Sequence, residues 1–127
     1  MALYNTPKLK PFVRSEASNQ RSRDNTVVAA TGTAILSGTV LGKVTATGKY
    51  KPYANGNSDG TEVAAGILYE GVPAGITGDV KAVIFNMDCE VNRKELTGLD
   101  VAGEADLRAL GIKVRGVTTP GIATPAL

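Results

Sequence analysis

Glycine and other turn-forming residues interrupt this sequence so often that only short elements fit between them. The chain has 127 residues and 15 glycines, and the apolar runs between the glycines are rich in Val, Ala, Ile and Thr. Runs of four to eight such residues bounded by Gly, Asn and Asp predict strands. We therefore expect one compact domain that is mainly β, a β-rich α+β fold built from short strands.

The predicted strands lie at residues 26–30, 34–36, 39–45, 61–69, 79–85, 89–91 and 112–117. Gly42 lies inside one of them, which indicates a bulge or a close approach of another backbone. Residues 50–60 contain Asn-Gly and Asp-Gly pairs and predict turns throughout. A single helix is predicted over residues 101–110, because Asp100 can cap its start and Gly111 can end it.

The first 25 residues differ in composition from the rest. They carry five basic and two acidic residues, a net charge of +3, and the remainder of the chain has a net charge of −1. Pro7 and Pro11 prevent a continuous helix, and residues 14–25 are too polar to order by themselves. We expect an amino-terminal arm over residues 1–25, mobile until it docks on a partner; a terminus without a partner is the alternative.

Apolar side chains stand ahead of the polar part of this arm and are candidates for docking, namely Leu3, Tyr4, Leu9, Phe12 and Val13. The folded domain is expected over residues 26–117. Residues 118–127 are uncharged and contain two prolines, which predicts an extended tail.

The predicted core is thin. The chain has no Trp and only two Phe, whereas aromatic side chains supply much of the buried area of ordinary cores. Small domains with thin cores often gain stability by association, because an interface adds buried area. This composition favours an oligomer.

Most catalytic and metal chemistry is excluded by residue type. The chain has no His, which removes the Ser-His-Asp and Cys-His arrangements and the usual zinc ligand sets. Its one cysteine, Cys89, stands between Asp88 and Glu90, whose charges raise a thiol pKa rather than lower it. We interpret Cys89 as a half-buried strand residue, and we expect no catalytic residues.

Two further patterns fail as ligand sites. Residues 55–60 resemble the start of a calcium loop, but Gly66 stands where a bidentate Glu is required. Residues 38–44 contain a Gly-Lys pair, but Val44 stands where a phosphate-binding loop needs a hydroxyl. We expect a hairpin loop at the first and a strand at the second, with no metal and no cofactor.

Charge and hydropathy restrict the partners. The formal net charge of +2 is too small to favour direct nucleic-acid binding. No segment approaches the roughly 18 apolar residues of a membrane span, and the start lacks the apolar region of a secretory signal. We expect synthesis in a cytoplasm, with no membrane as partner.

Several segments together resemble the head decoration proteins of lambdoid phages. They lie at residues 36–44, 48–50, 58–68, 82–84, 90–93 and 111–115, and the resemblance spans about 26–117. Its most specific part is the stretch Asp-Gly-x-x-x-Ala-x-Gly-Ile-Leu at 59–68. The arm and the tail lie outside it.

The resemblance implies a small-barrel or β-tulip-like domain with one short helix and an extended arm. It also implies homotrimers on the outside of an expanded phage head, at three-fold sites, where the arm docks on the major capsid protein. The capsid-binding residues would then be Tyr4, Pro7, Leu9, Phe12, Val13 and Arg14.

Two alternatives remain open at this stage. One is another phage structural role, in a tail or spike. The other is a surface carbohydrate-binding module, in which Tyr50 and Tyr53 would form an exposed platform in their loop.

Overall fold

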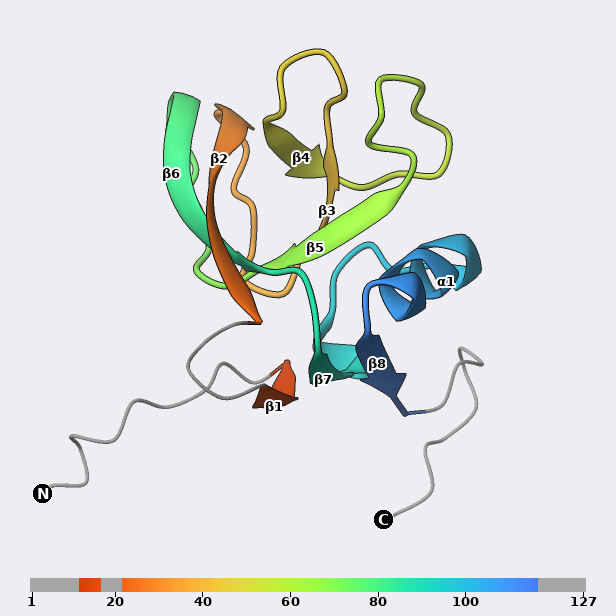
Figure 1. Cartoon of the computed structure of the whole chain (residues 1–127). Coiled ribbons are helices and arrows are strands. Elements are labelled where there is room, and N and C mark those ends of the chain that lie inside the picture. Colours follow the sequence, from red (N-terminus) through yellow and green to blue (C-terminus); the bar gives the residue numbers. More distant parts are fainter. Residues whose placement is uncertain (1–11, 17–21, 117–127) are drawn as a thin grey trace, which may run out of the picture.

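The structure is a computed structural model that describes residues 12–16 and 22–116. It consists of a barrel, a small second sheet below it and one α-helix beside that sheet (Figure 1). The elements are β1 (Val13–Glu16), β2 (Arg23–Thr31), β3 (Val40–Lys43), β4 (Tyr50–Pro52), β5 (Ala64–Leu68), β6 (Thr77–Phe85), β7 (Cys89–Asn92), a 3-10 helix (Arg93–Glu95), α1 (Val101–Ala109) and β8 (Ile112–Arg115).

Five strands close the barrel in the order β2-β4-β3-β5-β6. Its longest ribbon is the antiparallel pair of β2 and β6, which stays in register from the pair of Arg23 and Phe85 to the pair of Thr31 and Thr77. A short parallel contact between β2 and β4 completes the ring. Closure rests on few pairs, because β2 meets β4 only at Val28 and β6 meets β5 only at Ile84 and Phe85.

Successive residues of the central strands supply two separate cores. In β5, Ile67 and Leu68 are both fully buried but belong to different apolar clusters. The same division holds for Ile84 and Phe85 in β6, because adjacent side chains of a strand point to opposite faces. One face of these strands fills the barrel, and the other packs on the small sheet and α1.

The small sheet has the order β1-β7-β8, and α1 packs beside it. The Asp100 carboxylate caps α1 by accepting a hydrogen bond from the Gly103 amide at 2.7 Å, and it accepts a second one from the Tyr53 hydroxyl, also at 2.7 Å. On the inner side of the helix, the Leu107 side chain is fully buried. The helix is therefore attached to the loop that leaves the barrel at β4.

The prediction of a mainly β, small-barrel fold with one short helix is confirmed. The predicted cap and the predicted end of the helix are also confirmed, since Gly111 has a φ of +84° directly after it. Several strand predictions need correction. β2 begins at Arg23 rather than at residue 26, residues 50–52 form β4 instead of a turn, and residues 34–36 contribute one bridge, between Ile35 and Val72. Other strands differ at one end: β5 begins at residue 64 rather than 61, β6 begins at 77 rather than 79, and β8 ends at 115 rather than 117.

Gly42 confirms the expected close approach. The pairing of β3 with β5 shifts there, and a Cβ on Gly42 would stand 2.5 Å from the Cα of Thr61. Backbone atoms cannot move away as a flexible side chain would. No such contact surrounds Gly56, which has nothing within 4 Å of its position for a Cβ.

We predict that Gly42→Ala lowers the free energy of unfolding by about 2 kcal/mol, because overpacking displaces two strands. Gly56→Ala, the matched control, should change it by less than about 0.5 kcal/mol. Denaturant titrations of both variants measure the difference. Equal stability of the two variants would contradict the close approach.

Candidate functional site

The amino-terminal strand β1 lies at one edge of the small sheet, antiparallel to β7, with Glu16 opposite Cys89. The residue before it, Phe12, has 1% of its surface exposed. Its carbonyl oxygen accepts a hydrogen bond from the Asn92 amide at 2.7 Å, and its ring meets the ring of Phe85 edge-on with centroids 5.8 Å apart. Residues 12–16, which we call the arm root, are therefore packed into the domain.

A partly buried ion pair joins the end of the arm root to the start of β2. Arg23 donates to both oxygens of Glu16, from Nε at 2.9 Å and from Nη2 at 2.7 Å, and both side chains are at most 20% exposed. The guanidinium also lies over the rings of Tyr69 and Phe85, at 4.6 and 5.3 Å from their centroids. The hydrogen bonds to Glu16 raise the pKa of Arg23, which keeps the cation charged.

The structure divides the six predicted capsid-binding residues into two groups. Tyr4, Pro7 and Leu9 lie outside the described residues, as does the side chain of Arg14. Phe12 and Val13 are buried in the core beside the small sheet, so their side chains are not available to a partner in this conformation. Their binding to a capsid is untested and stays a prediction.

The structure describes only part of the expected arm and places its expected boundary with the domain inside a strand. The boundary between residues 25 and 26 falls inside β2. Of the predicted arm, residues 12–16 and 22–25 are described, and most of them lie in strands. Whether the remainder is mobile before docking stays a prediction, and the predicted tail at 118–127 lies outside the described residues.

Tyr50, in β4, and Tyr53, directly after β4, do not form an exposed platform. Tyr50 and Tyr53 are 8% and 5% exposed, and burial together with the hydrogen bond to Asp100 raises the pKa of Tyr53 to about 12. Aromatic rings that bind a sugar need an accessible face. This removes the feature that favoured a carbohydrate-binding module.

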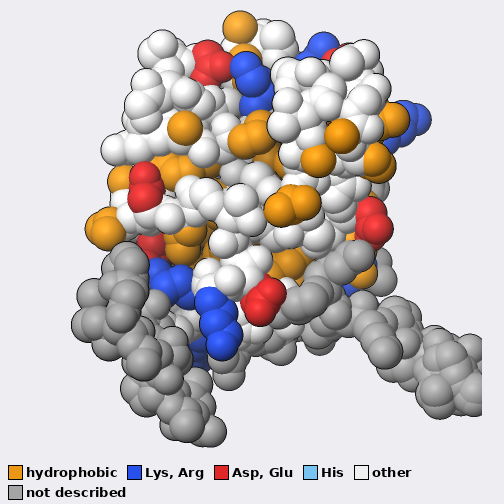
Figure 2. Space-filling view, turned by 180° about the vertical axis from the view of Figure 1, so that it is seen from behind, with side chains coloured by type: hydrophobic (Ala, Val, Ile, Leu, Met, Phe, Trp, Pro, Cys, Tyr) orange, Lys and Arg blue, Asp and Glu red, His pale blue; other side chains and the backbone are white. Residues whose placement is uncertain are grey.

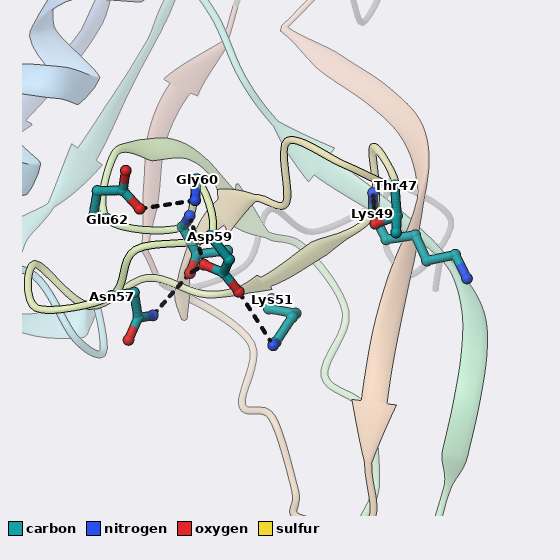
Figure 3. A network of polar contacts seen from close by, with 8 residues as sticks. Thr47, Lys49, Lys51, Asn57, Asp59, Gly60 and Glu62 are labelled. Atoms are coloured by element: carbon teal, nitrogen blue, oxygen red, sulfur yellow. Dashed lines mark hydrogen bonds and ion pairs between the residues drawn. The ribbon is translucent and has the colours of Figure 1, made fainter.

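The calcium-like stretch closes on itself as a turn (Figure 3). The Asp59 carboxylate accepts hydrogen bonds from the Thr61 hydroxyl and from the Thr61 amide, and Lys51 lies 3.5 Å away. These contacts lower the pKa of Asp59 to about 2. Glu62 accepts from the Gly60 amide at 2.8 Å. Within residues 12–16 and 22–116, no group of three potential metal-ligating side chains is found.

Cys89 is unsuited to nucleophilic chemistry. Its side chain lies in the core between β7 and the barrel with 4% of its surface exposed. Burial, with the nearby charges of Glu16 and Asp88, raises the pKa of the Cys89 thiol to about 12. A thiol that stays protonated is a packing group.

An open groove runs along the outer wall of the barrel. It has a volume of about 740 Å³ and is lined largely by apolar side chains of β2, β6 and the loop between β5 and β6, among them Val27, Val72, Pro73, Ile76 and Val83. On the face shown in Figure 2, apolar side chains form several small groups separated by polar and backbone atoms. Large apolar side chains are also exposed elsewhere in the described residues, at Leu36, Val63, Met87 and Val101.

No helix in the described part of the chain is long and apolar enough to cross a membrane.

A family model described as bacteriophage lambda head decoration protein D matches residues 2–112. The match begins near the start of the chain, so the expectation that the arm lies outside the resemblance is wrong. It ends at the first residue of β8. A search among curated proteins finds no match.

Sequence reasoning did not identify the pair of Glu16 and Arg23. The two residues are seven positions apart in a polar stretch without periodicity, so no helical or strand spacing relates them. The available signal was the opposite charges of Glu16 and Arg23. They stand on either side of a segment whose one apolar residue is Ala17.

The burial of Phe12 generates a prediction. Phe12→Ala should lower the free energy of unfolding by about 3–5 kcal/mol, because it removes a fully buried ring from a thin core. The control is Lys94→Ala, whose side chain is exposed and whose effect should stay within about 0.5 kcal/mol. Chemical unfolding measures both; equal effects would show that Phe12 is not part of the core.

Proposed function

This chain belongs to the family of the bacteriophage lambda head decoration protein D, and on that premise we propose how it decorates a phage head. It binds the outside of the expanded capsid as homotrimers at three-fold sites, in contact with the major capsid protein. There it stabilises the shell against the pressure of the packaged DNA. It is made in the host cytoplasm and ends in the virion, on the capsid exterior.

The family match over residues 2–112 is the observation that carries this proposal. The match includes the arm as well as the domain, so a function that uses both is favoured. The surface supports self-association, because the described domain leaves an open apolar groove and several large apolar side chains exposed. A trimer would bury part of this surface.

The arm is the proposed contact with the major capsid protein. Tyr4, Pro7 and Leu9 supply apolar and turn-restricting groups, and the segment before Phe12 carries Lys8 and Lys10 without an acidic residue. An extended segment can add a strand to the edge of a neighbour's sheet, where backbone hydrogen bonds provide affinity and alternate side chains provide specificity. The positive charge suits an acidic capsid surface.

Stabilisation follows from linkage. A subunit that binds the expanded lattice and not its precursor stabilises the lattice by RT ln(1 + [L]/Kd), about 2.7 kcal/mol per site at a hundredfold excess over Kd. A trimer with three arms gains further through effective concentration, because the second and third arms bind as parts of one molecule. Three arms that each bind weakly therefore bind strongly together. No covalent bond is made or broken.

We predict that the full chain carrying Tyr4→Ser, Pro7→Ser and Leu9→Ser binds purified expanded heads at least about tenfold more weakly, since it loses its apolar anchors. Co-sedimentation measures the binding, and light scattering checks that the variant is still a trimer. The matched control carries Ala2→Ser, Asn5→Ser and Thr6→Ser in the same segment and should bind as the unmodified chain does.

Retained binding of the anchor variant would overturn the docking of the arm. Purified tails, offered in parallel, test the remaining alternative. Sedimentation of the unmodified chain with tails and not with heads would favour a tail or spike component.

A further inference from the structure

We propose that the arm root, residues 12–16, is a fixed anchor that positions the arm, with the pair of Glu16 and Arg23 as its latch. Capsid engagement is then confined to the residues before Phe12. This inference rests on the proposed function and assigns positioning roles to residues that the capsid does not touch.

The first support is the number of separate contacts that hold so short a segment. The Phe12 ring is buried against Phe85, the Phe12 carbonyl oxygen accepts from Asn92, and β1 pairs with β7. Each contact holds a different part of the root: a side chain, a carbonyl group and a strand backbone. Release of the root requires the loss of all of them.

The second support is the geometry of the latch. Glu16 and Arg23 form a two-point fork, and both side chains are at least 80% buried. Such a fork fixes orientation as well as distance, because the guanidinium and the carboxylate must be coplanar. The exposed pair of Arg115 and Glu90 in the same sheet is longer, at 3.3 Å for each contact, and more open to water.

The third support is that the start of the root and the basic partner of the latch contact the same ring. Phe85 packs against Phe12 on one side, and the Arg23 cation lies over its face. Tyr69 stacks on Phe85 with centroids 5.7 Å apart, and the Arg23 guanidinium also lies over the Tyr69 ring. Phe12 is therefore attached to this aromatic cluster directly, and Glu16 is attached to it through Arg23.

These contacts decide how the arm can dock. If a capsid strand had to peel β1 away, binding would first expose Phe12, which disfavours that state by more than about a hundredfold. A root that stays in place avoids this loss. It also fixes the point at which the arm leaves the domain. The apparent affinity for the capsid is proportional to the fraction of molecules whose arm is in the binding-competent position, so a fixed root favours binding.

The register of β1 and β7 supplies a direct test. Glu16 and Cys89 are Cα partners in an antiparallel pair, a separation of about 4.5–5.5 Å that a disulfide can span. Glu16→Cys removes the latch when reduced. Refolding in the presence of oxidised glutathione, so that the Cys89 thiol reacts before it is buried, replaces the latch with a disulfide between the two cysteines. One variant thus gives an open and a locked root.

We expect the reduced form of Glu16→Cys to bind expanded heads about tenfold more weakly than the unmodified chain, and the oxidised form to bind as well as the unmodified chain. Arg23→Lys should also bind more weakly, because an ammonium cannot make the fork. Arg115→Lys is the matched control and should leave binding unchanged. Binding of each variant is measured under conditions in which circular dichroism shows that the variant is fully folded. If the latch served only to stabilise the fold, binding would then be unchanged.

Three outcomes overturn the inference. Weaker binding by the oxidised form than by the reduced form would show that β1 must leave the sheet to dock. Equal binding by all variants would show that the latch positions nothing. If the unmodified chain itself fails to bind heads, the proposed function fails first and the inference with it.

Discussion

The ring of Phe85 is the contact on which the arrangement of this domain depends. It ends β6, one of the two longest strands of the barrel, while its neighbour Ile84 fills the barrel interior. Phe12 reaches the ring from the small sheet, and Tyr69 and Arg23 reach it from the barrel. In a chain with two Phe and no Trp, both phenylalanines are used at this one junction.

This junction links the fold to the proposed function. In the proposed function, the arm binds the capsid and the body of the domain forms the trimer. Here the arm enters the domain at Phe12, and the first side chain inside is packed on the ring that joins barrel and sheet. Phe12 directly precedes β1, so the described part of the arm is continuous with the small sheet.

The elements that could be predicted from the sequence are those with a local signal. The helix has Asp100 before it and Gly111 after it, and the apolar run that ends β6 marks a buried strand. The family resemblance could also be recognised, from segments between residues 36 and 115 and most specifically from residues 59–68, although the family match also extends over the arm.

The remaining features depend on contacts that are distant in sequence. β1 has the sequence Val-Arg-Ser-Glu, which carries no strand pattern, and it is ordered by β7, more than 70 positions away. Tyr53 lies in a turn-rich stretch, but it is buried because its hydroxyl donates a hydrogen bond to Asp100, the residue that caps α1. A local pattern cannot report a partner that only the fold brings near, and so the arm root appeared to be part of the arm.

Hydrogen exchange at the Asn92 amide, in the free protein, tests the central claim most directly. This amide donates to the Phe12 carbonyl oxygen, so it is protected only while the arm root is in place. The account predicts protection comparable to that of the Leu68 amide, which donates to Thr39 inside the barrel. Exchange at the rate of an unprotected loop amide, with Leu68 still protected, would show that the root detaches on its own and would contradict the account.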